Sequence, residues 1–547
     1  MYKGSGSILA LLVLRCIALP PQSCLADGMP SLPPEEEREV EPIQRFFPAS
    51  SNGVPDRYIV ALNLASAASA APELMGEVGG ALGYIFKHVF SGFEAQLSEE
   101  QAEALSTNPL VRYVIQDHYL EEEPVSSLPP HCYEGYDQND NDFPPVPGPM
   151  NLQPTQDLDC SDLSTSGNCI DNWGLDRVDQ DVLSLSETFA YRQAGSGIEV
   201  YVVDMGVDRD NREFLNSTLS GSRVLPGIQT QCTNFPNNPA CVDGHTACAS
   251  QTSAVAGGHG THVAGIIGGR TFGLAKDVTI VPVKALCAGN TMTHHVLGLE
   301  WILIDHDEEE PTAIVNISGL NSLGAVAGGH CSYYDPQCGS GAAYRDAMIA
   351  LAGRDNLLVV QSAGNKSFSQ IPGTNPPQYY ARLEACDNSF GDEADYVAPW
   401  ATVEQMRAIA RIVVAAGSSE SDGLWRSSVG ENGHPFGSTV GACVDIFAPA
   451  ARINASFYRN DLEPPAEDEV VCQLSGTSMA APHVSGVAAM MLETAPAMSA
   501  RSLRAMLLNL GGTGLLESNS GAADYIGANS PNLLLHWDAT DIFWRRL

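Results

Sequence analysis

From about residue 172 onward, the chain alternates continuous apolar runs with segments rich in glycine and alanine. Such a run predicts a strand buried on both faces, as in a parallel sheet that helices cover on both sides. We therefore predict a parallel-sheet α/β domain over residues 166–547. Its predicted strands comprise residues 197–204, 278–286, 313–318, 356–365 and 411–419.

A smaller pattern of strands and helices precedes this domain. Ser98 and Gln101 have the spacing of a capping box and predict the start of a short helix. The order of the elements predicts a small α+β, ferredoxin-like domain over residues 57–122. Its predicted strands comprise residues 57–63, 88–97 and 111–117, and its predicted helices residues 72–86 and 98–105.

Two segments have the composition of flexible chain. Residues 27–56 are rich in proline and glutamate, which predicts a flexible acidic segment. Residues 123–165 are rich in proline, aspartate, asparagine and serine, which predicts a linker. The run "DQNDND" in the linker lacks the glycine and glutamate of an EF-hand loop, so we do not expect one.

The N-terminus has the pattern of a secretory signal. Lys3 precedes an apolar stretch over residues 8–19, and small residues end at Ala26. We predict a signal peptide over residues 1–26, with a structural N-terminal helix as the alternative. A bacterial lipoprotein signal at Cys24 is disfavoured by the preceding Pro-Gln-Ser. No later apolar run is long enough to predict a membrane span.

Composition and charge narrow the class of protein. Hydrophobic residues make up 44% and charged residues 17% of the 547, as in a globular protein, and the net charge is -37. This acidic balance argues against nucleic acid and anionic membranes as partners, since both require clustered lysine and arginine. A secretory signal and 14 cysteines together favour disulfides. Their connectivity stays open, although two pairs lie close enough for local bridges: Cys160 with Cys169 and Cys331 with Cys338.

Four polar residues lie where predicted strands end or helices begin. In open α/β sheets, chemistry gathers at the carboxyl ends of strands. Each residue also has a purely structural interpretation, as a cap, a turn or part of a core helix. A metal site at His259 and His262 lacks a third ligand in register. Asp204 and Asn365 end predicted strands, and His259 and Ser478 begin small-residue helices.

Together these residues indicate nucleophilic catalysis. The order Asp204, His259, Ser478 differs from α/β-hydrolases, in which serine comes first, and from chymotrypsin-like enzymes, in which histidine comes first. At a helix start, the backbone N–H of Ser478 is available to an oxyanion. We expect Pro482 to fall in the first helical turn, where its missing N–H costs nothing.

Three sequence blocks resemble the signature blocks of the subtilase serine proteases: "VVDMGVD", "GHGTHVAGIIGG" and "SGTSMAAPHVSGVAA". The stretches "GRTFGLAKDVTIVPVKAL" and "CVDIFAPAARI" are most similar to the proteinase K branch. The resemblance spans roughly residues 172–537, and the segment 57–122 resembles the inhibitor-type propeptide of that family. It implies that His259 is the base, that Asp204 orients it, and that Asn365 and the Ser478 N–H bind the oxyanion.

The resemblance implies a secreted serine endopeptidase made as a zymogen, cut in cis within residues 123–165. Its expected partners are peptide or protein substrates with an apolar or aromatic P1 residue, and its own propeptide; a monomer is expected. The resemblance implies no cofactor for catalysis. A kexin-like enzyme is disfavoured, because the roughly 70 residues after Ser478 leave little room for a further domain. The alternative is a subtilase that cleaves itself once and then acts as a binding protein with the propeptide retained.

The chain departs from the family on the strand expected to pair with substrate. Ser318, Gly319 and Leu320 are the predicted substrate-binding residues, yet Gly319 and Leu320 stand where the family has Leu-Gly. An insertion at about residues 369–405 either shapes substrate access or is inert, and long surface loops are tolerated cheaply.

Further ligands follow from the resemblance alone. It implies a structural calcium ion at Asp445, with a turn aspartate as the alternative. It also implies two disulfides, Cys248–Cys287 and Cys386–Cys443. Asn216 and Asn454 lie in glycosylation sequons, and so does Asn365, where a glycan would block the oxyanion site.

Overall fold

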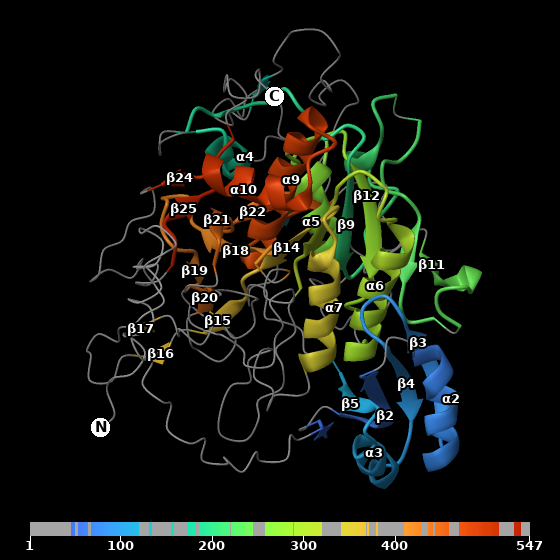
Figure 1. Ribbon diagram of the computed structural model, residues 1–547. Coiled ribbons are helices and arrows are strands. Elements are labelled where there is room, and N and C mark those ends of the chain that lie inside the picture. The colour runs from blue at the N-terminus through green and yellow to red at the C-terminus, as the bar shows by residue number, and fades with distance from the viewer. Residues whose placement is uncertain are drawn as a thin grey trace, which may run out of the picture. The chain divides into compact units, whose positions relative to one another are not determined.

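A ten-stranded sheet forms the centre of the described part of the computed structural model, with the order β11-β10-β12-β9-β13-β14-β18-β21-β25-β24 (Figure 1). The seven pairings between β10 and β25 are parallel, whereas β11 and β24 pair antiparallel at the edges. The strands are β9 (Glu199–Asp204), β10 (Gly227–Gln229), β11 (Val242–Asp243), β12 (Thr279–Lys284), β13 (Ala313–Ile317), β14 (Leu357–Ser362), β18 (Val413–Ser418), β21 (Ile446–Pro449), β24 (Gly512–Thr513) and β25 (Leu533–Leu534).

The structure describes part of the chain, and the statements below concern that part. It comprises residues 45–49, 53–63, 67–119, 131–133, 155–157, 172–180, 185–218, 220–232, 234–243, 258–287, 289–319, 341–367, 369–370, 379–380, 408, 410–427, 436–440, 444–458, 470–513 and 530–537.

Helices cover both faces of the sheet. Alternate residues of β9 face opposite ways: Val200 and Val202 belong to one buried cluster, and Tyr201 and Val203 to the other. This confirms the predicted α/β fold with a buried, mostly parallel sheet. The first cluster includes α5 (His259–Gly268), α9 (Thr477–Thr494) and α10 (Ala500–Leu510), and the second includes α6 (Met292–Asp305) and α7 (Ala342–Gly353).

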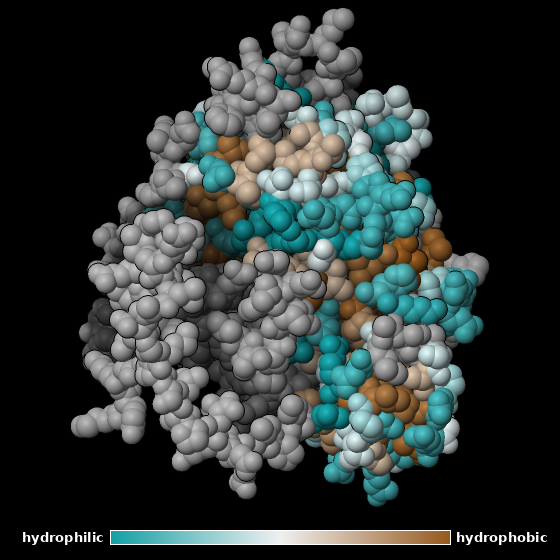
Figure 2. Space-filling view, viewed as in Figure 1, coloured by the Kyte–Doolittle hydropathy of each residue, from teal (hydrophilic) through white to brown (hydrophobic). Residues whose placement is uncertain are grey.

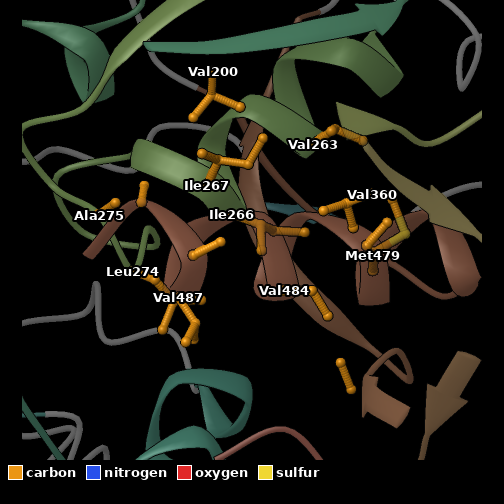
Figure 3. Packing of buried hydrophobic residues seen from close by; sticks show 14 of the residues in the cluster. Val200, Val263, Ile266, Ile267, Leu274, Ala275, Val360, Met479, Val484 and Val487 are labelled. Atoms are coloured by element: carbon orange, nitrogen blue, oxygen red, sulfur yellow. The ribbon is translucent and has the colours of Figure 1, made fainter. Parts of the chain in front are cut away.

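Helices α5 and α9 pack against each other beside β9. Ile266 and Ile267 of α5 lie between Val200 of β9 and the α9 residues Val484 and Val487 (Figure 3), and all five are buried. Burying such a side chain contributes about 1.5–3 kcal/mol. The two helices whose first residues include His259 and Ser478 are therefore held at a fixed separation.

The far end of α9 is tied to the turn that precedes β9. Glu493 accepts hydrogen bonds from the backbone N–H groups of Ala194 (2.6 Å), Gly195 (2.8 Å) and Ser196 (3.3 Å). Burial raises the pKa of Glu493, while these three donors oppose that shift. One carboxylate thus joins the helix of Ser478 to the strand of Asp204.

The N-terminal elements form a separate five-stranded sheet in the order β1-β5-β2-β4-β3. The helix predicted over 98–105 is confirmed with its capping box. Part of the segment predicted to be flexible, residues 27–56, contributes β1 and the first residues of β2. The elements are β1 (Phe46–Phe47), β2 (Gly53–Leu62), α2 (Ala67–Val78), β3 (Ala81–Phe86), β4 (Gly92–Gln96), α3 (Glu99–Ser106) and β5 (Val111–His118).

The helix predicted over 72–86 was wrong beyond residue 78. Gly79 and Gly80 have φ angles of 78° and 102°, left-handed conformations that end a helix and that glycine adopts without steric cost. Residues 81–86 instead form β3, which pairs antiparallel with β4.

The N-terminal sheet packs against α6 and α7, and each side of this contact contributes a carboxylate that binds groups of the other side. Glu300 of α6 is fully buried and accepts the N–H groups of Lys87 (2.9 Å), His88 (3.0 Å) and Val89 (2.8 Å). From the N-terminal sheet, Asp117 of β5 lies at the N-terminus of α6, where negative charge is favourable. Asp117 accepts the hydroxyl of Thr291 (2.6 Å) and the N–H of Thr293 (3.0 Å).

Apolar and charged contacts extend this docking to α7. Phe86, Phe90 and Ile115 belong to the same buried cluster as α6 and α7. Asp346 of α7 accepts the Tyr113 hydroxyl at 2.7 Å and forms an ion pair with Arg112. Domain 57–122 therefore shares a continuous core with the larger domain.

Two disulfides join described cysteines: Cys132 with Cys472, and Cys232 with Cys241. Their spacing in the sequence did not indicate either pair. Cys287 is also disulfide-bonded, as the resemblance implied. The remaining predicted pairs lie outside the described residues: Cys160–Cys169, Cys331–Cys338 and Cys386–Cys443, together with the partner proposed for Cys287, Cys248.

No described helix has the length and hydrophobicity needed to cross a bilayer. Hydrophilic residues cover much of the described surface on the face that Figure 2 shows. The predicted signal peptide, residues 1–26, lies outside the described residues.

Candidate active site

Asp204 is the last residue of β9 and is fully buried. Its backbone carbonyl accepts the N–H groups of Ala285 (3.0 Å) and Leu286 (3.2 Å), which follow β12. One carboxylate oxygen accepts the N–H of Met205 at 2.7 Å. The carboxylate is therefore fixed at the carboxyl end of a central strand, where chemistry gathers in open α/β sheets.

His259, the first residue of α5, lies directly against this carboxylate. Its Nδ1 is 2.9 Å from Asp204 Oδ1 and 3.0 Å from Oδ2. Since a carboxylate only accepts, Nδ1 carries the proton and Nε2 is the basic nitrogen. Gly260 allows this approach, because a Cβ there would lie 2.2 Å from the carbonyl oxygen of Gly206.

Ser478 is the second residue of α9 and is buried. Its hydroxyl donates to the carbonyl of Ser318, just beyond β13, at 2.6 Å. The expected place of Pro482 was wrong. The helix begins at Thr477, so Pro482 lies in the second turn, where it removes the hydrogen bond to the carbonyl of Ser478.

Thr477 sets the orientation of the Asn365 amide. The N–H of Thr477 donates to Asn365 Oδ1 at 2.9 Å, and the Thr477 hydroxyl donates to the same oxygen at 2.8 Å. The hydroxyl in turn accepts the N–H of Gly364 at 3.0 Å. Because a backbone N–H requires an acceptor, the atom that faces Thr477 is the amide oxygen. The amide of Asn365 lies against Gly476, two residues before Ser478.

A second histidine supports α5 rather than a metal ion. His262 Nε2 lies 3.1 Å from the carbonyl oxygen of Ile453 and 3.0 Å from that of Cys472. Burial lowers the pKa of His262 to about 3, so the ring is neutral and donates to these carbonyls. It joins α5 to the hairpin of β22 (Ile453–Phe457) and β23 (Val470–Leu474).

The predicted substrate strand is described only in part. Ser318 and Gly319 follow β13, and Leu320 lies outside the described residues, as does most of the insertion at 369–405.

The Asp445 carboxylate is bound by hydrogen-bond donors. It accepts the N–H of Val414 at 2.9 Å and forms an ion pair with Arg504. Calcium takes oxygen ligands, and a guanidinium at the carboxylate opposes a second cation. The described groups around Asp445 therefore do not fit a calcium site.

Sequence reasoning did not assign the role of Thr477. Its position between Gly476 and the predicted nucleophile is the available signal, since a hydroxyl at a helix start can bond groups beyond the helix.

Residues 195–522 match the family described as Subtilase family, and they contain Asp204, His259, Asn365 and Ser478. The chain belongs to the subtilase family. Residues 57–122 match the family described as Peptidase inhibitor I9. The family prediction is thereby confirmed: this is a subtilisin-like serine endopeptidase with an inhibitor-type propeptide.

Two curated relatives are similar to this chain, and one solved structure shares its fold. Alkaline serine exoprotease A of Vibrio alginolyticus is 28% identical over 487 residues, covering 86% of this chain and 67% of the relative. The Extracellular serine proteinase of Thermus sp. (strain Rt41A) is 29% identical over 367 residues, covering 66% and 65%. The chain thus spans about two thirds of each relative. The structure of fervidolysin from Fervidobacterium pennivorans, a keratinolytic enzyme related to subtilisin, matches with a TM-score of 0.51 and 18% identity over 90% of this chain and 62% of that chain. It supports the fold alone.

Proposed function

We propose that this subtilase is a secreted zymogen that hydrolyses peptide bonds with Asp204, His259 and Ser478 and releases its own propeptide. The observation that carries the proposal is the pair of contacts between His259 Nδ1 and both oxygens of Asp204. This pair fixes the tautomer with a basic Nε2 at the start of α5, which packs against the helix of Ser478.

In the first step, Ser478 Oγ turns from the Ser318 carbonyl toward His259 Nε2 and attacks the scissile carbonyl carbon. His259 takes the hydroxyl proton, and Asp204 stabilises the resulting imidazolium. The oxyanion is bound by Asn365 Nδ2 and the Ser478 N–H, each donor contributing about 2.7–4 kcal/mol.

The remaining steps return the groups to their starting state. His259 gives its proton to the leaving amine, which departs and leaves an acyl group on Ser478. Water then attacks the acyl carbon while His259 takes its proton, and the acid product leaves as the proton returns to Ser478 Oγ. Ser318, Gly319 and Leu320 would form the wall along which an extended substrate lies.

The docked N-terminal domain supports the zymogen part of the proposal. Its match to the inhibitor family and its buried contacts with Glu300 and Asp346 support an intramolecular inhibitor. The word "Extracellular" in the name of the Thermus relative supports secretion. The alternative remains a protein that cuts itself once and then binds partners with the propeptide retained.

The test compares secreted wild type with Ser478→Ala. Wild type should mature and cleave a chromogenic peptide with an aromatic P1 residue, whereas Ser478→Ala should stay full length and inert. Ser485→Ala is the matched control, because Ser485 lies on the same helix and its hydroxyl bonds Asn316. If purified Ser478→Ala protein still matured in the absence of any other protease, autoprocessing would be refuted. A wild type that matures without turnover would favour the binding protein.

A further inference from the structure

Strand β6 (His131–Tyr133) lies in the predicted linker yet belongs to the sheet beside the active site. It pairs antiparallel with β23, with Tyr133 opposite Val471, Cys132 opposite Cys472 and His131 opposite Gln473. The pairing is locked by the Cys132–Cys472 disulfide, which joins positions 340 residues apart. The linker is thus covalently attached to the larger domain at this strand.

The hairpin that β6 joins supports both candidate catalytic helices. Strand β23 leads into α9, and Ser478 follows Leu474 by four residues. The carbonyl of Cys472 accepts a hydrogen bond from the ring of His262, which lies one helical turn beyond His259 on α5. The disulfide therefore fastens β6 to the strand that contacts α5 and continues into the nucleophile helix.

The direction of β6 shows from which side the chain arrives. Since β23 runs toward Ser478 and β6 is antiparallel to it, His131 lies at the nucleophile end of the hairpin and Tyr133 at the far end. The chain enters β6 from the side of Ser478 and leaves away from it. On the inhibitor side, Tyr119 bridges to Thr291 at the start of α6.

We propose that β6 stays in the mature enzyme as a disulfide-locked strand, so that the cut which frees the inhibitor falls N-terminal to Cys132. The proposal rests on the proposed autoprocessing. A cut beyond Tyr133 would leave residues 57–122 covalently bound through Cys132, and their release would then need a reductant. A cut before Cys132 is simple hydrolysis, in which water adds across one peptide bond and no thiol changes its oxidation state.

The first test is N-terminal sequencing of the mature wild type, with peptide mapping under non-reducing conditions. We expect a mature chain that begins before Cys132 and contains the Cys132–Cys472 cross-link. A mature chain that begins after Cys132 would overturn the proposal.

A second test does not depend on self-cleavage. In Ser478→Ala, a recognition sequence for a site-specific protease is inserted either before His131 or after Tyr133, and both proteins are cut and run on denaturing gels. Without reductant, the first cut should release the inhibitor fragment, and the second should release it only after dithiothreitol is added. In Cys132→Ser/Cys472→Ser, both cuts should release it at once.

The two tests separate the two claims. Release after the second cut without reductant, in the protein with both cysteines, would overturn the tether. A wild type that never matures would refute autoprocessing, and with it the predicted cut, even where the gels show the tether intact.

Discussion

Thr477 orients the amide of Asn365, although the two residues stand 112 positions apart in the chain. Its N–H and its hydroxyl both bind the amide oxygen, so the orientation of the amide is fixed before any substrate arrives. An oxyanion donor that needs no rearrangement during the reaction is worth most, because its ordering cost is met on folding. Thr477 is in this sense a positioning residue for the proposed oxyanion hole.

Asn365→Leu should lower kcat by about 100- to 1,000-fold and leave KM almost unchanged, because it removes a donor that acts on the transition state. Steady-state kinetics on a peptide substrate measure both constants. Thr477→Val keeps the N–H contact and loses the hydroxyl, so we expect a decrease in kcat of roughly tenfold, equivalent to one hydrogen bond. An unchanged kcat in Asn365→Leu would rule out the assigned role of this amide.

Glu300→Gln should weaken the hold of the catalytic domain on its propeptide. The buried carboxylate accepts three N–H groups, whereas glutamine offers one oxygen and places an NH₂ group against the other donors. The dissociation constant should rise by roughly 10- to 100-fold. It is measured from the activity regained when the self-cleaved complex is diluted.

The control for this prediction is Glu308→Gln, since the Glu308 side chain is 79% exposed and pairs only peripherally with Arg354. Freed Glu300→Gln enzyme should keep the wild-type kcat. A dissociation constant equal to that of wild type would show that the three contacts do not hold the propeptide.

His295→Phe should reduce the loss of unfolding free energy that occurs as the pH is lowered. Burial lowers the pKa of His295 to about 4 from 6.5, so the folded protein keeps the ring neutral. Below about pH 6.5 the unfolded chain binds a proton that the folded protein refuses, so this stability is complete above pH 6.5 and is lost as the pH falls toward 4. The loss amounts to about 2 kcal/mol at pH 5.

Denaturant unfolding at pH 8 and pH 5, in the Ser478→Ala background to prevent autolysis, measures this difference. His295→Phe should lose about 2 kcal/mol less than its parent between the two pH values. His88→Gln serves as control, since the His88 side chain is exposed. Equal losses in His295→Phe and its parent would contradict the buried neutral ring.

Chelation should not act through Asp445. Because Arg504 supplies the positive charge at this carboxylate, any decrease of Tm caused by EDTA should be the same in wild type and in Asp445→Asn. Arg504→Met should lower Tm in either condition, since it leaves the carboxylate without its ion pair. A decrease that vanishes in Asp445→Asn would instead identify Asp445 as a metal ligand.

Local patterns in the sequence were enough to predict the sheet and the site candidates. The apolar run before Asp204 is buried on both faces, so nothing in its pattern competes with a central strand. The placement of Asp204 at the strand end and His259 at a helix start follows from the same boundary. The contact between them depends on how α5 packs beside β9, which neither local pattern encodes.

Features that depend on distant partners could not be predicted in this way. The pairing of Cys132 with Cys472 is set by the antiparallel register of β6 and β23, which spacing does not encode. The acceptor of Thr477 is on Asn365, three residues beyond β14, and is likewise known only when α9 packs against that strand. The break between α2 and β3 could have been predicted from the local sequence, because Gly79 and Gly80 stand there. It was missed because the apolar residues on either side suit both a helix and a strand.

Both ends of helix α9 are held in place, so its length fixes the separation between them. Ser478 stands at one end, and Glu493, fifteen residues on, is bound to the turn before the strand of Asp204. Each residue of an α-helix adds about 1.5 Å of length and about 100° of rotation. One residue inserted between these ends would move either Ser478 away from its place beside Thr477 and Asn365 or the Glu493 carboxylate away from the turn that it binds. Surface loops generally tolerate insertions, whereas the number of residues between Ser478 and Glu493 cannot change without displacing one of the two.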